Sequence, residues 1–134
     1  MVLKRIYMYT IVTLLFSTTY QTAKSKLNYD FYFNNRVVNL GIIPLNRNKT
    51  VVVYELYNKS QNNVWIKQVK SSCGCTTVNY SKNIVKPRER RKIYVTVSTK
   101  YKNGYFSESV LIRLSDNTPH ILRIKGNKLS QNTD

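Results

Sequence analysis

The stretch Thr50-Val51-Val52-Val53-Tyr54-Glu55-Leu56-Tyr57 decides the fold class of this chain of 134 residues. All but Glu55 and Leu56 are β-branched or aromatic, and these residue types are enriched in β-strands. Successive side chains of a strand point to opposite faces, which places Val52, Tyr54 and Leu56 together toward a core. Glu55 then faces solvent, so the stretch predicts a half-buried strand.

The same alternation of apolar and polar residues continues outward from this stretch in both directions. Polar, turn-like segments separate it from further expected strands at 28–33, 37–43, 64–69, 92–98, 105–115 and 121–125, with a short edge piece at 76–80. Val69 has the wrong parity for its strand, which predicts a β-bulge just before the cysteines. No segment after the first 25 residues has a convincing helical period. About seven short strands at regular spacing predict an all-β fold, an immunoglobulin-like antiparallel β-sandwich.

Residues 1–25 have the three parts of a secretory signal peptide. Lys4-Arg5 gives a positive start, residues 6–16 are apolar and uncharged, and Ala23-Lys24-Ser25 offers small residues at the −3 and −1 positions of a cleavage site. The apolar run is shorter than the roughly 20 residues that span a bilayer. The pattern therefore predicts cleavage after Ser25, and an uncleaved interfacial or anchoring helix is the alternative.

These observations divide the chain into a signal peptide over 1–25, a sandwich domain over 26–128 and a disordered tail over 129–134. The mature form is expected to have no transmembrane span. It would face an oxidising compartment, where a cysteine pair tends to oxidise.

Basic residues greatly outnumber acidic ones. The chain has 22 Lys and Arg against 6 Asp and Glu, and residues 26–134 keep a net charge of +13 once Lys4, Arg5 and Lys24 leave with the signal peptide. This balance favours anionic surfaces. Its densest run supplies the candidate contact residues Lys86, Arg88, Arg90, Arg91 and Lys92. The alternative is compositional, because Lys, Asn, Ile and Tyr are all abundant. Export and the lack of a recognisable motif argue against a nucleic-acid partner.

Both cysteines lie in the segment Cys73-Gly74-Cys75. No bridge can therefore join distant strands, and the fold must depend on its core. A flat strand holds the two Cβ atoms about 6.5–7 Å apart, whereas a disulfide needs about 3.5–4.5 Å, so a bond requires a turn at Gly74. Three interpretations stay open: buried thiols at a packing point, a redox-active pair, and a soft-metal site in which two thiolates supply half of a tetrahedral shell.

Candidate catalytic residues are scarce. His120 is the only histidine, and its position after Pro119 at the mouth of a strand predicts a surface residue. The six acids do not pair closely in sequence, no glycine-rich phosphate loop occurs, and no Ser or Thr has an evident base. We therefore expect no enzyme activity and no cofactor.

Several short motifs occur in the order found in a known family. Ser72-Cys73-Gly74-Cys75-Thr76 resembles the signature of a bacterial exported family of unknown function, and the resemblance runs from about residue 38 to residue 126. The other resembling pieces are Asn39-Leu40-Gly41, Tyr54-Glu55-Leu56-Tyr57-Asn58, Gly104-Tyr105-Phe106 and Leu122-Arg123-Ile124-Lys125-Gly126. One piece departs, because Pro87-Arg88-Glu89 replaces the family's Pro-Gly-Glu. We expect a type I turn there, since arginine suits it better than type II.

The resemblance implies an immunoglobulin-like sandwich similar to the PapD and major sperm protein group, exported to the periplasm or outer envelope of a Gram-negative bacterium. It implies no established activity, cofactor or partner. We expect a binding or structural module that contacts another envelope protein through an exposed sheet edge. The anionic envelope surface is a second contact to consider. The alternative function is a thiol–disulfide or soft-metal module that uses Cys73 and Cys75.

Overall fold

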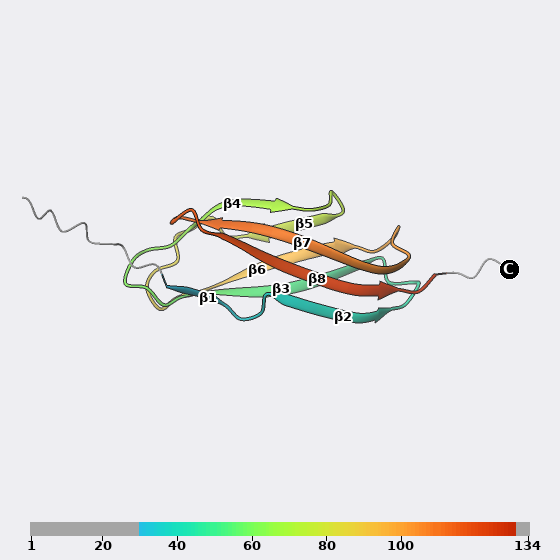
Figure 1. The fold of residues 1–134 in the computed structure, drawn as a ribbon. Coiled ribbons are helices and arrows are strands. Elements are labelled where there is room, and N and C mark those ends of the chain that lie inside the picture. Colours follow the sequence, from blue (N-terminus) through green and yellow to red (C-terminus); the bar gives the residue numbers. More distant parts are fainter. Residues whose placement is uncertain (1–29, 131–134) are drawn as a thin grey trace, which may run out of the picture.

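A computed structural model describes residues 30–130 of the chain. The predicted signal peptide, and the predicted tail from residue 131 onward, lie outside this range. Eight strands form two four-stranded sheets that pack face to face (Figure 1), which confirms the predicted all-β sandwich. Among the described residues, no helix is long and apolar enough to cross a membrane. The strands are β1 (Phe31–Phe33), β2 (Val37–Ile43), β3 (Lys49–Asn58), β4 (Ile66–Ser71), β5 (Thr76–Tyr80), β6 (Arg90–Ser98), β7 (Gly104–Leu114) and β8 (Pro119–Lys128).

One sheet has the strand order β1-β3-β6-β5 and the other the order β2-β8-β7-β4. Neighbouring strands pair antiparallel except β2 and β8, which run parallel. The predicted antiparallel sandwich therefore contains one parallel pair. Strand β2 pairs with a strand at the far end of the chain, so no hairpin fixes its direction.

The alternating pattern of the strands supplies the core. Val52, Tyr54 and Leu56 of β3 are buried as predicted, and the same holds for the inward positions of the strands that pack against it. Burial of an aliphatic or aromatic side chain of this size contributes about 1.5–3 kcal/mol. The other strands contribute the buried residues Val64, Ile66, Ile93, Val95, Val97, Phe106, Val110, Ile112, Leu114, Leu122 and Ile124.

A bulge interrupts β4 close to its predicted place. The pairing of β4 with β7 shifts register between Ile66 and Gln68. A bulge adds one residue to one strand and so reverses the side-chain parity beyond it. Val69 consequently packs against the core in spite of its spacing from Ile66.

The turn that precedes β6 differs from its prediction. Glu89 N donates to Lys86 O at 3.1 Å, and Arg88 adopts a φ of 66°. Pro87 followed by a residue with positive φ is the type II arrangement, so the expected type I turn is wrong. Arg88 N donates to Asn58 O at 2.8 Å and Asn58 N donates to Glu89 O at 3.0 Å. These two bonds hold the turn against the end of β3 and offset the roughly 1–2 kcal/mol cost of a left-handed residue.

The two regions that the sequence marked as candidate sites lie at opposite ends of the sandwich. Residues 72–75 cross from β4 in one sheet to β5 in the other (Figure 1). The basic run begins in the loop after β5 and continues into β6. Because the two loops flank β5 on opposite sides, they cannot form one contact surface.

Candidate functional site

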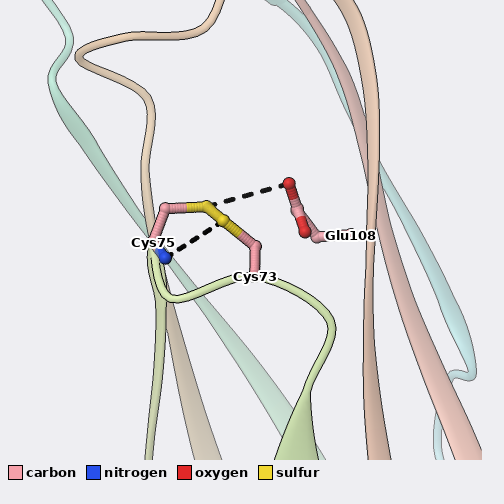
Figure 2. Close-up of side chains that lie close together, drawn as sticks. All are labelled: Cys73, Cys75 and Glu108. Atoms are coloured by element: carbon pink, nitrogen blue, oxygen red, sulfur yellow. Dashed lines mark hydrogen bonds between the residues drawn. A yellow bond between two sulfur atoms is a disulfide. The ribbon is translucent and has the colours of Figure 1, made fainter.

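Cys73 and Cys75 form a disulfide at the tip of the loop between β4 and β5 (Figure 2). Their Cα atoms are 5.1 Å apart, within the usual range for a disulfide. The required turn is present, because Thr76 N donates to Cys73 O at 3.1 Å across Gly74. Both cysteines are partly exposed. The pair is therefore neither a set of free thiols nor deeply buried.

The carboxylate of Glu108 lies directly beside this disulfide (Figure 2). Its Oε1 atom is 3.8 Å from Cys75 Sγ, and the residue is only 8 % exposed. Lys102 Nζ forms an ion pair with Oε1, and Ser72 Oγ donates to Oε2 at 2.9 Å. One cation thus balances the carboxylate, and one hydroxyl fixes its orientation.

Ser72 anchors the base of the loop to β7. Its backbone N–H donates to Ser109 O at 2.8 Å, and its Oγ accepts a hydrogen bond from Ser109 N at 2.9 Å. These contacts extend the pairing of β4 with β7 by one residue beyond the strand. The disulfide and Glu108 are therefore held in a fixed relation by the sheet itself.

Sequence reasoning missed Glu108 and Lys102 as members of this site. A signal for Glu108 was present, because Phe106, Glu108 and Val110 have the same parity and all three are buried. A carboxylate at an inward-facing position of a strand is unusual without a partner. No such signal exists for Lys102, which lies in the loop before β7.

The basic run is partly used by contacts within the chain. Arg90 Nη1 pairs with Glu55 Oε2 at 2.7 Å, and Arg91 Nη2 donates to Ile84 O at 3.0 Å. Lys86, Arg88 and Lys92 are exposed, and they complete the five predicted contact residues. Two of the five side chains are thus committed to the fold, which leaves a smaller basic surface than the sequence suggests.

A hollow of about 380 Å³ near the site is also lined by lysines, among them Lys100, Lys102 and Lys128. Two of these cations already have partners. Lys102 pairs with Glu108, and Lys128 Nζ donates to three backbone carbonyls, those of Pro44, Leu45 and Arg47, at 2.6–2.8 Å. Two of the three lysines of this hollow therefore serve the fold.

His120 is buried, with 9 % of its surface exposed, so the prediction of a surface position is wrong. Strand β8 begins at Pro119, two residues before the expected start at residue 121. His120 therefore lies within the strand and faces the same side as Leu122. The rings of Phe31 and Phe33 pack against it at centroid distances of 5.0 and 5.4 Å. Its Nε2 lies 3.0 Å from Thr118 Oγ1, and its Nδ1 has no hydrogen-bond partner among residues 30–130.

This environment predicts an acid-sensitive fold. Burial lowers the pKa of His120, the positive charge of Arg36 lowers it further, and Asp116 opposes the shift. The unfolded chain then binds a proton more readily than the folded chain. The free energy of unfolding should therefore fall as the pH drops below about 6.5, the ordinary histidine value.

The variant His120→Phe tests this expectation, because it keeps an aromatic ring in place and removes the titrating group. Urea unfolding from about pH 7.5 to about pH 5 should show a weaker pH dependence for the variant than for the wild type. The same loss of stability in both proteins would mean that other groups cause it.

Comparison with known proteins adds to the geometry. The sequence profile of a family described as "Protein of unknown function (DUF1573)" matches residues 31–128. A search of curated proteins finds no match. A protein of unknown function from Porphyromonas gingivalis W83 superposes with a TM-score of 0.66 at 11 % identity, over 81 % of this chain and 51 % of that chain. This chain thus spans about half the length of that protein.

Two eukaryotic domains have the same sandwich. The ASH/PapD-like domain 7 of human CEP192 superposes with a TM-score of 0.54 at 11 % identity, over 78 % of this chain and 87 % of that chain. WR4, a C. elegans member of the major sperm protein family, superposes with a TM-score of 0.51 at 12 % identity, over 73 % and 96 %. Identities this low establish a shared fold and leave function to the residues of this chain.

Proposed function

The chain belongs to the DUF1573 family of proteins of unknown function, and we propose that it is an exported module of a Gram-negative cell envelope. In this proposal it binds another envelope protein and is not an enzyme. Export is supported by the charged and apolar start of the chain and by the small residues before the expected cleavage point. The binding surface is the free edge of strand β5.

The observation that carries the proposal is the difference between β5 and the other three edge strands. Strand β1 has only three residues, and β2 shifts register next to Gly41, which has a φ of 66°. Strand β4 has a bulge and the exposed lysines Lys67 and Lys70. Short length, bulges and lysines are the devices that protect sheet edges from pairing. Strand β5 has five residues, no charge and an unbroken register with β6.

The free edge of β5 presents its hydrogen-bonding groups at alternate residues. Ser98 N donates to Cys75 O at 2.9 Å, which fixes the parity of the pairing between β5 and β6. Thr77 and Asn79 therefore bond to β6, and the backbone groups of Val78 and Tyr80 point outward. No strand among residues 30–130 pairs with that side. An extended segment of a partner could add to the sheet there as a further strand, through main-chain hydrogen bonds to Val78 and Tyr80.

Capture from envelope extract tests the proposal. The bait is the full chain, compared with the variant Thr77→Lys/Asn79→Lys, which adds two edge charges at exposed positions of β5. The matched control Tyr105→Lys/Ser107→Lys adds the same charge at exposed positions of β7, an interior strand. We expect the wild type and the control to retain one partner that the β5 variant loses. Equal capture by all three proteins would contradict the proposal.

A second candidate function is thiol–disulfide exchange at Cys73 and Cys75. The specific observation in its favour is a disulfide that is partly exposed and spans a single residue at the tip of a loop. Exchange requires attack of an outside thiolate on one of the two sulfurs, and therefore requires access. The loop meets this requirement.

A further inference from the structure

We propose that reduction of the Cys73–Cys75 disulfide creates a divalent-metal site in which Glu108 is the third ligand. The proposal rests on the second candidate function, because the disulfide must be reducible. The site is built by three atoms, Cys73 Sγ, Cys75 Sγ and a carboxylate oxygen of Glu108, which lie within 4.8 Å of one another (Figure 2).

The distances fit a tetrahedral ion. A zinc ion with ordinary bond lengths places a thiolate sulfur and a carboxylate oxygen about 3.6 Å apart. The observed distance from Cys75 Sγ to Glu108 Oε1 is 3.8 Å, so the loop and β7 already stand at the required separation. The two sulfurs of such a site are about 3.8 Å apart, and breaking the bond between them allows that separation.

The net charge of the proposed ligands and Lys102 favours a divalent ion. Two thiolates and one carboxylate contribute three negative charges, and Lys102, which pairs with Glu108, contributes one positive charge. A divalent ion brings the cluster to neutrality, which limits the cost of holding charges away from water. Zinc suits mixed sulfur and oxygen ligands, and the fourth tetrahedral position stays open for water.

Hydrogen bonds from neighbouring residues orient the Glu108 carboxylate for metal binding. Ser72 Oγ donates to Oε2 at 2.9 Å and is itself held by Ser109 N. Oε1 is thereby turned toward the sulfurs. Fixed orientation of a ligand by a hydrogen bond of this kind strengthens metal binding.

A dithiol can serve as the reductant of the Cys73–Cys75 disulfide. The dithiol transfers two electrons and two protons to the disulfide, and leaves as a cyclic disulfide, while Cys73 and Cys75 become thiols. The metal ion then displaces one proton from each thiol to solvent, and two sulfur–metal bonds form. In the oxidised chain the sulfurs are bonded to each other and supply no thiolate, so metal binding depends on redox state.

The test is equilibrium dialysis of the full chain against Zn²⁺, with the oxidised and the dithiol-reduced protein compared after the excess dithiol has been removed. A thiol assay first counts the free cysteines. The reduced wild type should bind one Zn²⁺ and the oxidised wild type none. Co²⁺ in place of Zn²⁺ should give the near-ultraviolet absorption of thiolate coordination in the reduced protein alone.

Variants identify the third ligand. Glu108→Gln should weaken Zn²⁺ binding by at least about tenfold, and Glu108→Asp, which keeps the charge opposite Lys102, should weaken it because its oxygen falls short of the sulfurs. Glu55→Gln, at a carboxylate of β3 that pairs with Arg90 and lies in the other sheet from Glu108, should leave binding unchanged. Circular dichroism of each variant confirms that it folds.

Two results would overturn the proposal in distinguishable ways. A disulfide that resists the dithiol in the folded chain would remove the second candidate function and the metal site together. Full reduction without Zn²⁺ binding, or binding that Glu108→Gln and Glu108→Asp leave intact, would leave exchange in place and exclude the site described here.

Discussion

Replacing Asn58 by alanine should lower the free energy of unfolding by about 4 kcal/mol, because it removes the four hydrogen bonds of its buried side chain, each of which contributes about 1 kcal/mol. Asn58 ends β3 and is fully buried. Its Nδ2 donates to Asn62 O at 2.7 Å and to Val85 O at 2.9 Å. Its Oδ1 accepts hydrogen bonds from the backbone N–H of Ser60 at 3.0 Å and from Ser60 Oγ at 2.7 Å.

The side chain of Asn58 thus joins the connection between β3 and β4 to the connection between β5 and β6. An isolated bridge between Val64 and Val85 links the same two connections. Urea unfolding measures the effect. Ser60→Ala, which removes part of the network, should cost about 1 kcal/mol.

Asn63→Ala is the matched control, because Asn63 is exposed in the same loop. It should change stability little. If Asn58→Ala cost no more than Asn63→Ala, the buried network would not stabilise the fold as described.

Replacing Lys102 by methionine should cost about 3 kcal/mol, because it strips a buried carboxylate of its counter-ion. The side chains of Lys102 and Glu108 are 15 % and 11 % exposed, so solvent screens the pair only slightly. Removal of both charges should be much less harmful than removal of one. The double variant Lys102→Met/Glu108→Leu should therefore recover most of the lost stability, as judged by urea unfolding at neutral pH.

Arg90→Met is the control for Lys102→Met, because it removes the cation of an exposed ion pair. Arg90 pairs with Glu55 but is 63 % exposed, so water replaces the lost contact and stability should barely change. An effect of Lys102→Met as small as that of Arg90→Met would show that the carboxylate beside the disulfide is well solvated. A double variant as unstable as Lys102→Met would show that the loss comes from packing.

The sequence predicted the fold well because the core depends on local alternation. The run from Thr50 to Tyr57 became β3 with its faces as expected, and β6 and β7 followed the same rule. The parallel pairing of β2 with β8 was not predictable in this way, since it joins segments more than eighty residues apart. The left-handed Arg88 was missed for a similar reason, because its conformation is imposed by hydrogen bonds to Asn58.

In the candidate site, too, local features were predictable from the sequence and long-range contacts were not. The cysteine pair and the need for a turn at Gly74 follow from two residues and one spacing. Glu108 lies 33 residues from Cys75 along the chain, and only the register of β7 with β4 brings them together. The inward parity of Glu108 was the one clue available, and no local rule connects a buried carboxylate with a particular loop.

The free edge of β5 is the proposed binding surface for a partner. Photo-crosslinking in the native host tests it most directly, with a photoreactive phenylalanine analogue at Thr77 on β5 or at Gln68 on the lysine-protected edge β4, both exposed positions. We expect a discrete adduct with one envelope protein from position 77 and none from position 68. An adduct from position 68 alone, or no adduct from either position, would contradict it.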